Sequence, residues 1–180
     1  MSDPVEARDT IVRRHLVIGW WSLLIFVTLG LVLETLHGFK VAWYVNTGEP
    51  ETTRLMLRLA HAHGTFLSLV HLAFAWTASQ AQGLSGRRPS VASRSLQAAG
   101  ILVPAGFLLA GMPGFVKTGG LRLGVLGGDP GLGIVLVPIG ALLLLLAVFL
   151  TALGVGARGD SQVNSSPPRK ADHSGTITSR

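Results

Sequence analysis

Residues 16–36 read LVIGWWSLLIFVTLGLVLETL, and this stretch decides the class of fold. Glu34 is its only ionisable side chain, and Trp20 and Trp21 lie near its start. About 20 consecutive apolar residues are enough for a helix to cross the hydrocarbon core of a bilayer. The run is too long for the apolar part of a signal peptide, and no Ala-x-Ala cleavage site follows it. We therefore expect an uncleaved first membrane span.

The composition also predicts a membrane protein. Of the 180 residues, 48% are hydrophobic and only 13% are charged, and the mean hydropathy is +0.50. Soluble domains carry about 25% charged residues. The net charge is +6, but the positive residues flank apolar runs, so we expect contact with anionic lipid and no nucleic-acid partner. The lack of cysteine excludes disulfides, thiolate metal sites and iron–sulfur clusters.

Four apolar segments predict an all-α fold, namely an integral membrane four-helix bundle with short loops. The expected spans cover residues 16–37, 56–79, 91–115 and 132–155. They form one membrane domain, residues 15–155, which follows a polar N-terminal segment, residues 1–14. Residues 156–180 form a tail rich in Ser, Pro, Gly and charge, a composition that predicts disorder.

The lysine and arginine residues predict the orientation in the membrane. Ten of the 15 lie in the N-terminal segment, around the loop after the second span, and in the tail. The other five lie on the opposite side, at Lys40, Arg54, Arg58, Lys117 and Arg122. Because cytoplasmic segments carry the excess of positive charge, we expect both termini in the cytoplasm and a multi-pass protein of the plasma (inner) membrane.

Ionisable side chains gather at the outer ends of the first two expected spans. Glu34 and His37 share one helix face, and Glu-x-x-His is the spacing found in di-metal sites of helix bundles. His61 and His63 lie near the start of the second span. Ionisable groups within membranes are costly and mark functional sites by default. Imidazoles with a carboxylate suit Zn, Cu, Fe or Ni, so Glu34, His37, His61 and His63 are the predicted metal ligands.

Haem is a second cofactor that these histidines predict. The sequence His61-Ala62-His63-Gly64 at a membrane helix end is similar to motifs in haem-copper oxidase subunits and their smaller membrane relatives. The similarity covers these four residues. A haem held by two histidines needs one on each of two helices at matching depth. His37 with His61 or His63 is therefore the expected pair of haem ligands, near the outer surface.

A deeper polar position is expected on the second span. His61, Thr65 and Ser68 fall on one side of that helix, with His71 at its edge. At 1.5 Å per residue, His71 lies roughly 15 Å below His61, which is too far for both to bind one metal ion. Glu34, His61, Ser68 and His71 could instead form a path for protons or small solutes.

Three functions therefore stay open. The first is a membrane protein that binds a transition metal or haem as part of a redox or metal-handling assembly. The second is a scaffold or accessory subunit whose Glu/His cluster only fixes helix packing. The third is a small proton-coupled carrier. No catalytic residue is predicted, and we expect a protein other than an enzyme. The expected partners are the lipid bilayer and other membrane subunits or further copies of the chain.

Overall fold

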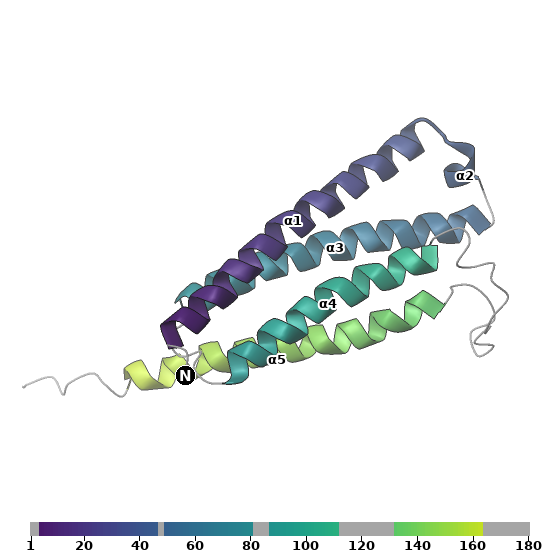
Figure 1. Cartoon of the computed structure of the whole chain (residues 1–180). Helices are drawn as coiled ribbons and strands as arrows, with labels where there is room; N and C mark the ends of the chain where they lie inside the picture. Colours follow the sequence, from purple (N-terminus) through teal and green to yellow (C-terminus); the bar gives the residue numbers. More distant parts are fainter. Residues whose placement is uncertain (1–3, 47–48, 81–86, 112–131, 164–180) are drawn as a thin grey trace, which may run out of the picture.

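A computed structural model of the protein describes residues 4–46, 49–80, 87–111 and 132–163 (Figure 1). These residues form helices and contain no strand, which confirms the all-α class. The elements are α1 (Pro4–Gly38), α2 (Ala42–Val45), α3 (Glu49–Gln80), α4 (Arg87–Gly111), the short 3₁₀ helix η1 (Leu132–Val135) and α5 (Leu136–Val163).

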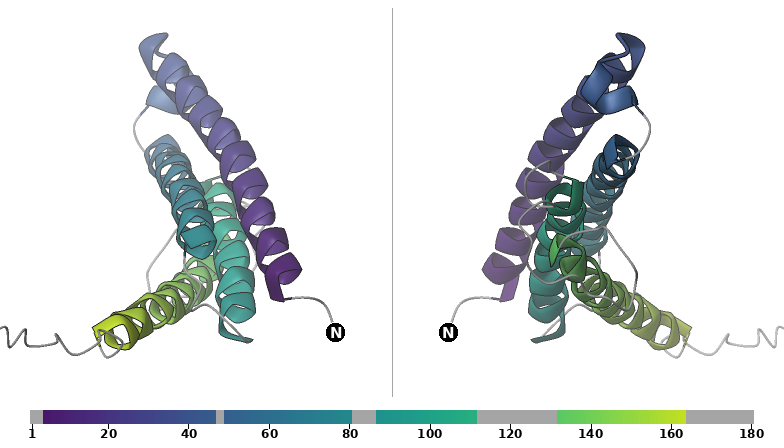
Figure 2. Two further views of the ribbon diagram at one scale, coloured as in Figure 1. Left: turned by 90° about the vertical axis from the view of Figure 1, so that its left-hand side faces the viewer. Right: turned by 90° about the vertical axis from the view of Figure 1, so that its right-hand side faces the viewer.

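The long helices pack in chain order. α1 packs along α3, α3 along α4, and α4 along α5, whereas α1 has little contact with α4 (Figures 1 and 2). The arrangement is an open row, and α5 diverges from the other helices. We call the end where α1 and α4 begin the terminal end, and the opposite end the α2 end. Small side chains allow the helices to approach closely, and the buried alanines are Ala60, Ala75, Ala78, Ala92, Ala99, Ala110 and Ala147.

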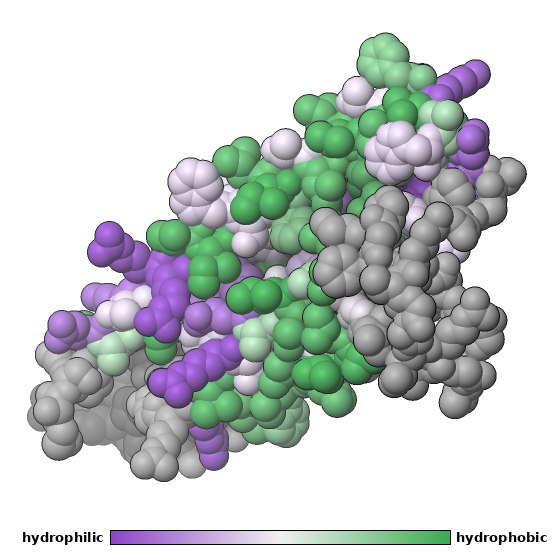
Figure 3. Space-filling model, turned by 45° about the vertical axis from the view of Figure 1, so that its right-hand side comes forward, coloured by the Kyte–Doolittle hydropathy of each residue, from purple (hydrophilic) through white to green (hydrophobic). Residues whose placement is uncertain are grey.

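Three helices are long and apolar enough to cross a membrane. They are α1 over Val5–Gly38, α4 over Arg88–Gly111, and α5 over Leu136–Gly156. α1 and α5 expose large apolar side chains along most of their length, as lipid-facing helices do. Figure 3 shows hydrophobic residues across the middle of the molecule and hydrophilic residues gathered toward its two ends. These features indicate a membrane protein.

The second expected span lies within α3, whose composition is more polar than that of the other three long helices. α3 carries Arg54, Arg58 and three histidines, yet it is 32 residues long and lies against two of the apolar helices. Four crossings, and the cytoplasmic location of both termini, therefore stay predictions.

Several helices extend beyond the expected spans. α1 begins at Pro4, so most of the polar N-terminal segment is helical. Its Arg8 donates a hydrogen bond of 2.8 Å to the carbonyl of Ser79, which satisfies a free carbonyl in the last turn of α3. α5 continues to Val163, where the sequence predicted a disordered tail. α4 continues through Pro104, and residues 112–115 of the third expected span lie outside the described residues.

Candidate functional site

Two histidines from different helices meet inside the molecule near the terminal end. The Nδ1 atoms of His15, on α1, and His71, on α3, are 2.6 Å apart. Their rings are stacked with centroids 4.8 Å apart, and Phe74 packs against the ring of His15. Both side chains are buried, with at most 1% of their surface exposed. At this distance one Nδ1 must carry a proton and the other must accept it, so the two rings share a hydrogen bond.

The hydrogen bonds continue from His15 to α4. Nε2 of His15 is 2.8 Å from the hydroxyl of Ser93, which in turn accepts a 3.0 Å hydrogen bond from Nε2 of Gln97. Ser93 makes best use of its hydroxyl if it donates to His15 while accepting from Gln97. His15 then donates from Nδ1 to His71, and His71 must carry its own proton on Nε2. That Nε2 is buried and has no hydrogen-bond partner among the described residues.

The sequence makes room for this pair with a glycine. A Cβ atom at Gly100 of α4 would lie 2.7 Å from Nε2 of His71, far closer than a nonbonded contact permits. On α1, Gly19 and Gly30 are buried, and an added Cβ atom would clash with Leu72 and His61 of α3, respectively. A lack of side chains at these positions brings α1, α3 and α4 close enough for the two imidazoles to be enclosed.

Further polar groups lie on α3 between the histidine pair and the α2 end. The hydroxyl of Ser68 is buried and donates to the carbonyl of Gly64 at 2.7 Å. The hydroxyl of Thr65 is also buried and has no partner among the described residues. One turn further on, Nδ1 of His61 donates to the carbonyl of Phe26 on α1 at 2.7 Å. Spacings of three and four residues place these groups on one side of α3.

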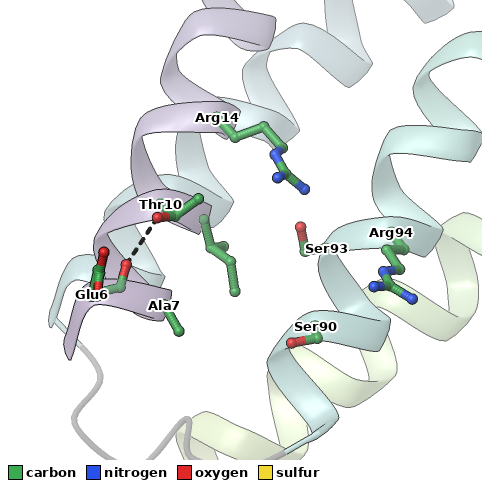
Figure 4. Close-up of a pocket in the computed structure, with 8 residues that line it drawn as sticks. Glu6, Ala7, Thr10, Arg14, Ser90, Ser93 and Arg94 are labelled. Carbon is green, nitrogen blue, oxygen red and sulfur yellow. Dashed lines mark hydrogen bonds between the residues drawn. The ribbon is translucent and has the colours of Figure 1, made fainter. Parts of the chain in front are cut away.

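A polar pocket of about 300 Å³ opens at the terminal end, between the first turns of α1 and of α4. Figure 4 shows Arg14 of α1 and Ser90 and Ser93 of α4 pointing into this space. Because Ser93 also contacts His15, its hydroxyl joins the pocket wall to the buried histidine pair.

The four predicted metal ligands lie apart from this pair. Glu34 and His37 are exposed on α1, and the ring of His37 meets that of Tyr44 edge-on, at 6.5 Å between centroids. His61 faces α1, whereas His63 donates to the carbonyl of Leu59 and packs on Phe107 of α4. In the described ranges, no three His, Asp or Glu side chains are placed to hold one metal ion.

The position at which α3 begins explains why the predicted ligands do not come together. The sequence argument placed His37 and His61 at similar depths, near the ends of their spans. α3 begins at Glu49, so His61 is twelve residues into the helix, about 18 Å from its start. His61 therefore lies level with Phe26 and Gly30 of α1, below Glu34. The deeper pair, Ser68 and His71, is buried in the structure.

His15 is the functional candidate that the sequence analysis missed. It directly follows Arg13 and Arg14 and precedes the first expected span by one residue, so hydropathy alone does not single it out. The available signal was its spacing from Gly19 and Gly30, four and fifteen residues along α1, which places all three near one helical face.

No protein-family model, no curated protein and no solved structure matches the chain. The candidate site therefore stands on its geometry.

Proposed function

We propose that the protein transfers protons through the interior of its helix packing, with His15 and His71 as the central relay. The sequence predicted a small proton-coupled carrier as its third open function, and the relay proposed here shares His71 with the proton path expected there. One observation supports it above the others: two buried imidazoles share a short hydrogen bond, and each has a second ring nitrogen directed away from that bond. Imidazole suits such a role because it can accept a proton on one nitrogen and release another from the second.

The steps follow from the hydrogen bonds. A proton from the pocket reaches Nε2 of His15 through the hydroxyl of Ser93, which passes on its own proton and takes up the incoming one. His15 releases its Nδ1 proton to Nδ1 of His71. His71 then releases the proton on its Nε2. Each ring gains one proton and loses one, and the hydrogen bond between the rings reverses direction. The reverse transfer would carry the proton back, so net flow in one direction requires both rings to regain their starting tautomers by reorientation and proton exchange with water.

Beyond His71, the path would continue along α3. The rise of 1.5 Å per residue puts Thr65 about 9 Å and His61 about 15 Å from His71 along the helix. Direct proton transfer needs hydrogen-bond distances, so water must fill the intervals. Thr65 supports this route, because its buried hydroxyl has no partner among the described residues and is an expected site for a bound water. In this proposal α3 crosses the membrane, and the terminal end faces the cytoplasm.

A scaffold role is the second candidate, because the same hydrogen bonds join three helices. Satisfied buried polar groups fix the relative positions of helices whether or not protons move. If these hydrogen bonds serve only to hold the helices together, the protein will conduct no protons.

Binding of a transition metal or haem has less support. Glu34 and His37 are exposed, and His61 and His63 face different helices. The visible spectrum and metal content of the purified protein test this function directly. A bound metal or haem that is lost in the His61→Ala variant would support this function over proton transfer.

Proton transfer is tested with the purified full chain in liposomes that contain a pH-sensitive dye. A potassium gradient with valinomycin supplies the driving voltage. We expect proton uptake well above that of empty liposomes, and a reduction of at least about tenfold in His71→Gln and in His15→Gln. His37→Gln is the matched control, since His37 is exposed at the other end of α1.

Circular dichroism and gel filtration in detergent check that each variant folds. Uptake equal to that of empty liposomes, or uptake unchanged in both folded relay variants, would overturn the proposal and favour the scaffold.

A further inference from the structure

The pocket at the terminal end has the chemistry of an anion site. Two arginines line it, Arg14 of α1 and Arg94 of α4, together with Ser90 and Ser93. Figure 4 shows the guanidinium of Arg14 reaching into the space between the helices, with Arg94 on the α4 side of the pocket. Neither arginine has a hydrogen bond or ion pair with any described residue. The lining also contains the carboxylate of Glu6, so its three charged groups sum to one positive charge.

The geometry favours phosphate over other anions. A guanidinium presents paired N–H donors that match two oxygens of a phosphate. The hydroxyl of Ser90 can donate to a remaining oxygen, whereas that of Ser93 already donates to His15. Ser90 lies in the first turn of α4, a helix of 25 residues, where the helix dipole adds a positive potential. The guanidinium of Arg14, the hydroxyl of Ser90 and the first turn of α4 thus meet at one space of about 300 Å³, which Arg94 also lines.

We propose that this pocket binds a phosphate group, either of an anionic phospholipid or of inorganic phosphate. Arg14 lies two residues before the apolar run that begins at Leu16, which is the level expected for lipid headgroups. The bound phosphate would lie beside Ser93 and therefore beside the His15–His71 pair. Binding itself does not depend on the proton-transfer proposal, and it can be measured without any proton flux.

The experiment uses the purified full chain in a neutral detergent. Native mass spectrometry measures binding of phosphatidylglycerol and phosphatidylcholine, and equilibrium dialysis measures binding of inorganic phosphate. A preference for phosphatidylglycerol without phosphate binding identifies a lipid site. Binding of inorganic phosphate identifies a site for the free ion. In either case we expect binding to weaken at least about tenfold in the double variant Arg14→Gln/Arg94→Gln.

The matched control is Arg13→Gln/Arg88→Gln, which removes the same charge from the same two helices but outside the pocket. The control should bind within about twofold of the unmodified chain. Arg14→Lys/Arg94→Lys keeps the charge and should bind at an intermediate level, since lysine lacks the paired donors. Equal losses in the pocket and control variants, or no binding of any of the three probes, would overturn the proposal.

Discussion

At position 100, the absence of a side chain decides where the ring of His71 lies. A Cβ atom there would come within 2.7 Å of Nε2 of His71, and the ring of His15 from α1 is stacked on the ring of His71. Gly100→Ala should therefore displace the ring and strain its hydrogen bond to His15. We expect a loss of about 1–3 kcal/mol in the free energy of unfolding, the usual cost of overpacking a buried position. Thermal unfolding in detergent, followed by circular dichroism, measures it.

Gly156→Ala is the control for that substitution. Gly156 lies in α5, and an added Cβ would meet nothing within 4 Å. Alanine is the better helix former, so this variant should keep or slightly raise the stability, by up to about 1 kcal/mol. A Gly100→Ala protein as stable as the unmodified chain would show that the ring is not confined as described.

The energetic coupling of the two histidines can be measured with a double-mutant cycle. His15→Leu and His71→Leu each leave the other ring buried without its partner, which costs about 1–3 kcal/mol. The double variant removes both polar groups, so its loss should fall below the sum of the single losses by at least about 1 kcal/mol. The cycle of His37→Leu with His71→Leu should be additive within about 0.5 kcal/mol, because His37 is exposed and distant in the chain. Additivity in the first cycle as well would argue against a shared hydrogen bond.

At the scale of the helices, the sequence predicts the elements better than their relative positions. Apolar runs identify the central parts of α1, α4 and α5, since a run of about 20 apolar residues is typical of a membrane-spanning helix and rare in soluble proteins. The register between α1 and α3 depends on the chain between them. A short helix, α2, occupies that connection, and α3 begins at Glu49, seven residues before the apolar segment expected from Met56. Hydropathy does not mark the first turns of α3 as helical, because the polar residues there are equally compatible with a loop. This shift pairs His61 with Phe26, and it pairs His71 with His15.

The contact between Arg8 and Ser79 joins two of these helices at the terminal end. Arg8→Gln should release the last turn of α3 without affecting its remainder, because the guanidinium satisfies a carbonyl there. We expect amide hydrogen exchange near Ser79 to speed up about tenfold, equivalent to about 1.4 kcal/mol of local stability. Hydrogen–deuterium exchange with mass spectrometry compares this peptide with one from the start of α3. Arg13→Gln serves as control, since Arg13 is exposed, and faster exchange in that variant too would assign the effect to charge alone.

For the whole molecule, the central question is whether α3 crosses the membrane with the other helices. α3 packs along α1 for much of its length, and the Arg8–Ser79 contact holds its end beside the start of α1. Arg13 and Arg88 should therefore lie on the same side of the membrane, opposite Ala42. The chain contains no cysteine, so single cysteines introduced at these exposed positions are the only thiols that a maleimide can label.

In intact bacterial cells, a membrane-impermeant maleimide should label the Ala42→Cys protein and leave the Arg13→Cys and Arg88→Cys proteins unlabelled. Permeabilised cells should show labelling of all three. The excess of positive charge at the terminal end supports this orientation. Labelling of both Ala42→Cys and Arg88→Cys in intact cells, with Arg13→Cys protected, would mean that α3 stays on one side. The polar groups along α3 would then face no membrane interior, and a proton path between the two sides through His71 would be ruled out.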